Sequence, residues 1–119
     1  SIATGSCIGL VYDDPRFTPP EQIRYDCCIV IDDTELGIDT ARLARRNLRE
    51  LRTRPGRYVC QPHRGGYVDV GKSYSRLLDH WIATSGYSLT DDPAIEWYEA
   101  VPAKNPGDAL EILLMLPVR

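Results

Sequence analysis

The sequence predicts one α+β domain built around an antiparallel sheet. Three observations indicate this fold class. Short apolar runs are separated by turn residues, a stripe of helical period runs from residue 70 to residue 82, and one strand–loop–strand pattern occurs twice, 86 positions apart. A chain of 119 residues can bury one hydrophobic core but not two. We therefore expect a single domain.

The repeated pattern is the most informative of these observations. Residues 10–13 (LVYD) align with residues 96–99 (EWYE), and Pro20 aligns with Pro106. In both copies the proline lies eight positions after the tyrosine, and a second apolar run follows, at 23–31 and at 109–117. The pattern predicts two β-hairpins derived from a duplicated unit.

The second unit, residues 57–119, reads as strand, helix, strand, strand. It begins with a strand at 57–62 and a turn at 63–66. The helix carries an apolar stripe and stops near Gly86. The stripe consists of Val70, Tyr74, Leu77, Leu78, Trp81 and Ile82. The first unit, residues 1–38, contains only the two final strands, and its leading strand and helix would precede Ser1. We therefore expect the chain to begin within a longer protein.

An arginine-rich segment, residues 39–56, connects the two units. Ala41, Ala44, Leu48 and Leu51 form one helical stripe within residues 39–51. Six arginines lie in this segment and a seventh follows it directly, at positions 42, 45, 46, 49, 52, 54 and 57. The segment is either the solvated face of a linker helix or a docking surface for an acidic partner, a neighbouring domain or phosphates.

Charge and composition exclude several classes of protein. A net charge of −3 argues against nucleic-acid binding through bulk charge. The longest apolar stretch, residues 112–116, is too short to span a membrane, so no membrane partner is expected. No C-x-x-C pair occurs, and His63 and His80 lack ligand spacing, so we expect no metal and no cofactor. Cys7, Cys27, Cys28 and Cys60 are predicted to be reduced core thiols of a cytoplasmic protein.

Five segments together resemble the GyrI-like (gyrase-inhibitor-like) effector-binding family, which includes the C-terminal ligand domains of AraC-type transcription regulators. They are residues 9–31, 63–81 (HRGGYVDVGKSYSRLLDHW), 85–89 (SGYSL), 95–102 (IEWYEAVP) and 110–119. The resemblance runs from about residue 8 to the end of the chain. It implies two strand-helix-strand-strand modules related by a pseudo-twofold axis, with a groove between them.

The resemblance also implies a ligand-binding acid in the pattern apolar-Glu-x-Tyr, which is found here at residues 95–98. That acid is Glu96, and Tyr98 projects from the same face of the strand. The repeat aligns Glu96 with the apolar Leu10, so the two copies differ at this position. A carboxylate between aromatic rings suits an organic cation. The alternative is that Glu96 faces solvent or pairs with Arg57 or Arg64.

Further aromatic residues are candidates for the wall of the groove: Tyr12, Tyr67, Trp81 and Trp97. Tyr12 and Tyr98 are equivalent in the repeat and could face each other across the axis. Each aromatic is also a candidate core residue, Trp81 above all because it lies on the apolar stripe. His63 more often closes a turn or a strand end than binds a ligand. Asp26 is either a second acid of the site or a strand residue at an edge or paired with arginine.

These residues lead us to expect a small-molecule effector domain of a bacterial-type regulator, binding cationic or aromatic amphiphiles such as dyes and drugs. DNA would be contacted only by a separate domain, and a homodimer is left open. One alternative is a hydrolase of electrophilic compounds, in which Glu96 activates water and Tyr98 or Trp97 positions the substrate. It is disfavoured because no Ser-His-Asp or Cys-His set accompanies the single acid. The other alternative is a protein-binding, gyrase-inhibitor-like module that uses the arginine segment.

Overall fold

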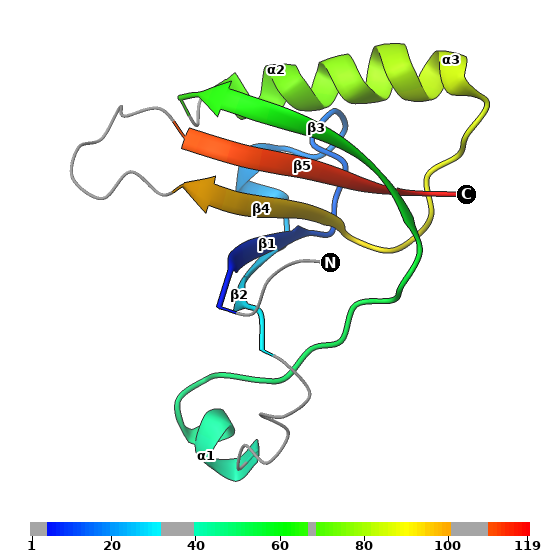
Figure 1. The fold of residues 1–119 in the computed structure, drawn as a ribbon. Helices are drawn as coiled ribbons and strands as arrows, with labels where there is room; N and C mark the ends of the chain where they lie inside the picture. Colours follow the sequence, from blue (N-terminus) through cyan, green and yellow to red (C-terminus); the bar gives the residue numbers. More distant parts are fainter. Residues whose placement is uncertain (1–4, 32–39, 67–68, 101–109) are drawn as a thin grey trace.

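A computed structural model describes residues 5–31, 40–66, 69–100 and 110–119, and its centre is a five-stranded antiparallel sheet (Figure 1). The strand order is β2-β1-β4-β5-β3. The strands are β1 (Cys7–Val11), β2 (Tyr25–Ile29), β3 (Arg57–Gly65), β4 (Ala94–Ala100) and β5 (Leu110–Val118). The predicted α+β class with an antiparallel sheet is confirmed.

Two hairpins meet in the middle of this sheet. Strands β1 and β2 form one hairpin, β4 and β5 form the other, and β1 pairs with β4. The first connection contains a short 3₁₀ helix, η1 (Pro20–Gln22). The second connection, including Pro106, lies outside the described residues. Both predicted hairpins are therefore present, and β1 and β4 are the central pair.

Strand pairing corrects the sequence alignment of the hairpins by one residue. Leu10 pairs with Asp26, and Trp97 pairs with Leu113, each 87 positions further on. The same shift of 87 relates the Gly9–Cys27 pair to the Glu96–Leu114 pair, whereas a shift of 86 reproduces neither. A one-residue slip moves every side chain to the other face of a strand. The structural counterpart of Glu96 is thus Gly9 and not Leu10; duplication of whole modules remains a prediction.

One nearly continuous helix covers one face of the sheet (Figure 1). It comprises α2 (Val70–Ser75), a π-type stretch η4 (Arg76–Ile82) and α3 (Ala83–Ser85). Four buried helix residues pack against three buried residues of β5. They are Val70, Tyr74, Leu77 and Leu78 on the helix and Ile112, Leu114 and Leu116 on the strand. Burying each large apolar side chain contributes about 1.5–3 kcal/mol, so this layer is the main core.

The face of the sheet under this helix is called the helix face here, and it includes Glu96 and Tyr98 because they pair with Leu114 and Ile112. The opposite face contains a smaller core of Ile8, Leu10 and Ile95. Partly buried residues complete that core: Cys28, Val30, Tyr58, Trp97 and Met115. The two faces thus carry different chemistry.

The cysteines differ from the prediction in their burial. All four are free thiols, but Cys7, Cys27 and Cys60 are exposed and only Cys28 is partly buried. Cys7 and Cys27 lie on β1 and β2, while the helix packs on β5. Cys60 lies on the edge strand β3, which pairs only with β5 among the described strands. The prediction of core thiols is therefore wrong for these three.

The predicted helix over residues 39–51 is also much shorter in the structure. Among the described residues helix α1 spans Thr40–Arg45, so it ends six residues before the predicted end, and the backbone at Asn47 takes a left-handed φ of 56°. Leu48 and Leu51, which were to form the apolar stripe, are 55% and 40% exposed. Without a surface to pack against, a short amphipathic segment gains too little to stay helical.

Strand β3 runs three residues further than predicted, to Gly65, so residues 63–65 belong to the sheet and not to a turn. The limits of the two units at 1–38 and 57–119 remain predictions. None of the helices in the described ranges combines the length and apolar character that crossing a membrane requires.

Gly86 ends the helix in the left-handed conformation, with φ of 82°. A Cβ at Gly86 would touch nothing within 4 Å, so replacement by alanine introduces backbone strain alone. We expect Gly86→Ala to lower the free energy of unfolding by about 1–2 kcal/mol. Gly71→Ala, within α2 and equally unobstructed, is the control and should raise it by about 0.5–1 kcal/mol. Urea unfolding measures both, and equal signs would contradict this account.

Candidate functional site

Glu96 is a buried carboxylate on the helix face of the central strand β4. Its exposed fraction is 3%, which excludes the solvent-facing alternative. Tyr74 of α2 donates a hydrogen bond to Glu96 Oε2 at 2.8 Å, and Tyr98 of β4 donates one to Oε1 at 3.2 Å. Helix and sheet each supply one phenol, so the carboxylate is held at the junction between them.

A third tyrosine extends this network across β1. The hydroxyls of Tyr25 and Tyr98 are 2.9 Å apart, although Tyr25 lies on β2, two strands away from β4. The Tyr25 ring passes over Gly9, and a Cβ at Gly9 would overlap that ring. Gly9 also pairs with Glu96 across the β1–β4 ladder. Because Gly9 has no side chain, the Tyr25 ring can lie across β1 and reach the site.

The charge of Glu96 has no cationic partner in the described part of the chain. The alternative partners lie elsewhere: Arg64 pairs with Glu111 at 2.8 Å, and Arg57 is exposed on edge strand β3. Ionised carboxylates away from water are costly unless they are paired. Two phenol donors satisfy the oxygens as hydrogen-bond acceptors but supply no positive charge. Within the described residues, the oxygens of Glu96 thus have hydrogen-bond donors but no cationic partner.

The surroundings of Glu96 also act on Tyr74. Burial, and then the nearby Glu96 charge, raise the pKa of the Tyr74 hydroxyl well above its ordinary value of 10.0. Tyr74 consequently remains protonated and keeps donating its hydrogen bond at any physiological pH.

A hollow of about 260 Å³ opens beside Tyr74 on the helix face. Tyr74 and Leu78 form its helix wall, and Val11, Ala94 and Leu116 are among its apolar lining. Four aspartates also line it: Asp13, Asp14, Asp91 and Asp92. We call this space the acidic hollow. A second, shallower hollow lies beyond Tyr98 and Tyr25 and is lined also by Cys7 and Cys27, so Glu96 and its phenols lie between two openings.

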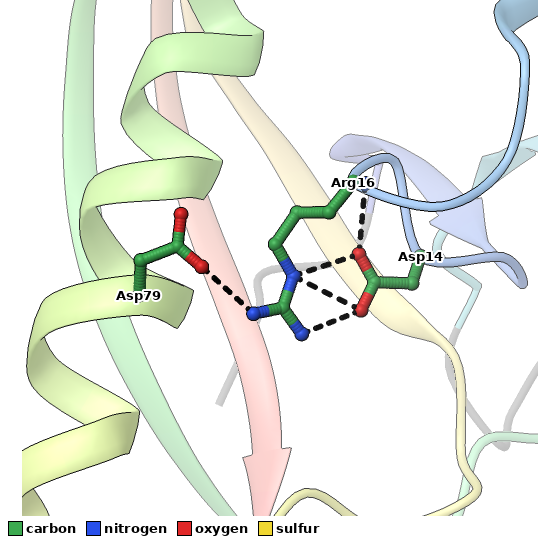
Figure 2. Close-up of polar contacts among 3 residues, drawn as sticks. All are labelled: Asp14, Arg16 and Asp79. Carbon is green, nitrogen blue, oxygen red and sulfur yellow. Dashed lines mark hydrogen bonds and ion pairs between the residues drawn. The ribbon is translucent and has the colours of Figure 1, made fainter.

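Arg16 ties the wall of the acidic hollow to the helix (Figure 2). Its guanidinium contacts Asp14 at 2.8 Å within the β1–β2 connection and Asp79 at 2.8 Å on η4. Hydrogen bonds from Arg16 hold the pKa of Asp14 below its ordinary value, so this carboxylate stays ionised. The link thus joins the β1–β2 connection to the helix beside the acidic hollow.

Tyr12 and Trp97 do not join Glu96 as the sequence suggested. Trp97 follows Glu96 directly, so it points to the opposite face and packs with Ile8 and Leu10. Tyr12 follows β1, lines the acidic hollow and donates a hydrogen bond to Asp26 at 2.6 Å. That bond raises the pKa of Tyr12 to about 12. Tyr98 pairs with Cys7 at the other end of β1, so the prediction that Tyr12 and Tyr98 face each other is wrong.

Trp81 lies on η4 but is not buried. It is 40% exposed and stacks on Tyr87, with ring centroids 5.8 Å apart. The π-type winding places more residues in each turn than an α-helix does, which rotates Trp81 off the apolar stripe. The remaining aromatic candidate, Tyr67, lies outside the described residues.

The two weaker candidates have structural partners. His63 is 5% exposed; its Nδ1 lies 2.7 Å from Ser73 Oγ and its Nε2 lies 3.2 Å from the Gly66 carbonyl oxygen. His63 thus connects β3 to α2 and to Gly66, which directly follows β3. Asp26 lies on edge strand β2 and pairs with Arg49 at 3.1 Å, the structural role weighed for it.

Sequence reasoning missed three residues of the network: Tyr25, Tyr74 and Gly9. Tyr74 was recognised only as part of the apolar stripe, and Tyr25 only as part of a strand. A correct register would have placed Gly9 beside Glu96 and Tyr25 on the same face. No group of three or more metal-ligating side chains occurs within the described ranges.

The fold and the site define a small-molecule binding domain. The whole chain, residues 1–119, matches the model of the GyrI-like small molecule binding domain. The chain therefore belongs to this family, as the sequence resemblance indicated.

Two curated proteins of Escherichia coli are similar to the chain. A protein named "Probable transcriptional regulator YgiV" in strain K12 is 28% identical over 114 residues, and the protein of the same name in O157:H7 is 25% identical over 114 residues. Each match covers 92% of this chain but 65% of the relative. The chain thus spans just under two thirds of the length of these relatives.

Gly9 and Tyr25 should behave as one unit in a double-mutant cycle. We expect Gly9→Ala to lower the free energy of unfolding by about 1–3 kcal/mol, because the new methyl group displaces the Tyr25 ring. In a Tyr25→Ala background the same change should be neutral or stabilising by up to about 1 kcal/mol. Urea unfolding of the four proteins gives the coupling; an equal cost in both backgrounds would show that the ring is not the obstacle.

Tyr74 should make stability fall in alkali. Its folded-state pKa is raised, so the folded state holds the proton that the unfolded state releases above about pH 10. Stability from this group is complete below pH 10 and is lost as pH rises further. Tyr74→Phe should cost about 1.5–3 kcal/mol at pH 8 through the lost bond to Glu96, with a smaller deficit at pH 11. Tyr87→Phe is a control at an exposed tyrosine, and its effect on the free energy of unfolding should be the same at pH 8 and at pH 11.

Proposed function

We propose that this domain binds an organic cation, that Glu96 pairs with the positive charge, and that the occupied domain regulates transcription. The carrying observation is a carboxylate that is 3% exposed, hydrogen-bonded by two phenols, and without a cation among the described residues. A bound cation would balance this charge at low solvent exposure, where the attraction is strongest.

Aromatic groups around Glu96 favour a bulky cation over a metal ion. Tyr74 and Tyr98 bring aromatic rings as well as hydroxyls to Glu96, and aromatic rings attract quaternary ammonium groups that lie over their faces. The acidic hollow beside Tyr74 adds apolar surface from Val11, Ala94 and Leu116. Its volume of about 260 Å³ lies just below the usual range for ligand pockets, so it would hold a compact aromatic or amphiphilic group.

Entry of the cation would follow the electric field of the hollow. The aspartates that line it favour positively charged compounds over neutral and negative ones. Three of them already form ion pairs, Asp13 with Arg24, Asp14 with Arg16 and Asp92 with Arg54, so the attraction is weaker than four unpaired charges would give. Once inside, the cation competes with the hydroxyl of Tyr74 for Glu96 Oε2, so Tyr74 has to rotate or share the carboxylate. Specificity would then come from the size of the group that fits between the helix wall and the sheet.

A role in regulation is supported by the relatives, whose name describes a probable transcriptional regulator. The resemblance to the ligand domains of AraC-type regulators points in the same direction. In this role the domain works in the cytoplasm beside a DNA-binding domain. A ligand changes the state of a regulator only by the difference in its affinity for the two states.

The test compares benzyltrimethylammonium with neopentylbenzene, its uncharged carbon isostere. A ligand at one hundred times its dissociation constant should add about 2.7 kcal/mol, which raises the melting temperature by several degrees. We expect the ammonium compound to stabilise the parent domain and to lose at least tenfold in affinity in Glu96→Gln. Glu111→Gln, the same substitution at a more exposed residue of β5, is the matched control and should bind as the parent does.

Other outcomes would contradict the proposal in distinct ways. Equal loss of both compounds in Glu96→Gln would mean that the variant disturbs the groove and that charge pairing is not the cause. If the domain binds neither compound, and no related larger cation either, it does not recognise small organic cations and the proposal is wrong. Consumption of an added electrophilic ester or epoxide, lost in Glu96→Gln, would favour the hydrolase alternative.

A further inference from the structure

The charges of this chain are strongly segregated, which its overall charge of −3 conceals. Residues 40–57, called the arginine arm here, contain seven arginines and one acid, Glu50. This gives the arm a charge of +6 and leaves −9 for all other residues. An average over the chain therefore says little about what the arm attracts.

The arm is almost entirely exposed. Apart from Leu43, every residue from 41 to 57 is exposed to solvent, and α1 projects away from the sheet (Figure 1). Three ion pairs join arginines of the arm to described residues, and all three are peripheral: Arg49 with Asp26, Arg52 with Glu50, and Arg54 with Asp92. The guanidinium-bearing side chains in these pairs are 68% to 85% exposed. Surface pairs of this kind contribute little and exchange readily for other anions.

The arm contains arginine and no lysine. The planar guanidinium group forms two parallel hydrogen bonds to phosphate oxygens, which a lysine ammonium cannot do. Beyond α1 the arginines recur every two or three residues, at 49, 52, 54 and 57, along a segment with no helical or strand structure up to residue 56. Such a segment spans up to about 3.3–3.6 Å per residue, so it presents a charge about every 7–11 Å. Duplex DNA offers one phosphate per 1.7 Å of its axis, a denser anion row than a protein surface provides.

We infer that the arginine arm binds the phosphate backbone of duplex DNA without reading its sequence. Glu96 takes no part in this contact. Because the acidic remainder of the chain repels DNA, the arm has to hold the body away from the duplex, which its projection from the sheet permits. Binding by the domain alone is weak and depends steeply on salt.

The test measures fluorescence anisotropy of a labelled 20-base-pair duplex with the 119-residue chain at pH 7, between 20 and 150 mM salt. Each phosphate contact contributes about 0.9 to the negative slope of log affinity against log salt. The triple variant Arg45→Gln, Arg46→Gln and Arg49→Gln should lose at least tenfold in affinity at 20 mM salt. Its slope should become shallower by about 2–3. Far-UV circular dichroism and thermal unfolding should match the parent.

The matched control removes three positive charges from the body, through Arg64→Gln, Lys72→Gln and Arg76→Gln, and should keep the parent slope. Equal loss in both triple variants would overturn the inference, since net charge alone would explain it. A parent chain that does not bind duplex at 20 mM salt would overturn it as well. Poly-glutamate is added as a competitor of the labelled duplex. If it displaces the labelled duplex as well as unlabelled duplex does at equal charge concentration, the arm binds acidic protein partners instead. Binding of benzyltrimethylammonium is measured separately in each variant. If the DNA experiment contradicts the inference, the proposal of a cation site at Glu96 is therefore still tested on its own.

Discussion

The pairing of β1 with β4 is the constraint on which the rest of the structure depends. This ladder joins the two hairpins and brings Gly9 against Glu96 at the centre of the sheet. A hydrogen in place of a side chain at position 9 lets a phenol from β2 lie across β1, while the helix contributes a second phenol from above. The site is therefore assembled from four elements that are distant in sequence, and it exists only when both hairpins are docked.

A buried carboxylate at this point lowers the stability of the fold, but it also provides a group that can bind a ligand. Its desolvation is offset in part by the hydrogen bonds from Tyr74 and Tyr98, and hydrogen bonds to a charged group are worth about 1.5–3 kcal/mol. Aliphatic residues would pack the same space without this cost. The acid and its phenols are kept at a junction that opens on two hollows, an arrangement that suits recognition better than stability.

The sequence predicted the elements better than their contacts. Alternation and loop length are local properties, so both hairpins and the fold class were predicted from them. Glu96 and Tyr98 were expected as site residues because of the resemblance to the family. The register was wrong by one residue because matching letters at a shift of 86 ignores the side on which each residue lies, and this misplaced Tyr12. Trp97 was wrongly grouped with Glu96 for another reason, since adjacent residues of a strand point to opposite faces. The exposure of Trp81 depends on π-type winding, and the end of α1 depends on the absence of a packing surface; neither is encoded in local periodicity.

The close fit of Gly9 and Tyr25 also has a consequence for how this family can change over time. Position 9 cannot gain a side chain while an aromatic ring lies over it, and the ring at position 25 loses its place once that space is filled. The two positions are therefore expected to vary together among related domains, with a small residue at one accompanying a large residue at the other. Lineages that lose this pair would have to reach the acid of β4 from another direction, and so would recognise differently shaped compounds.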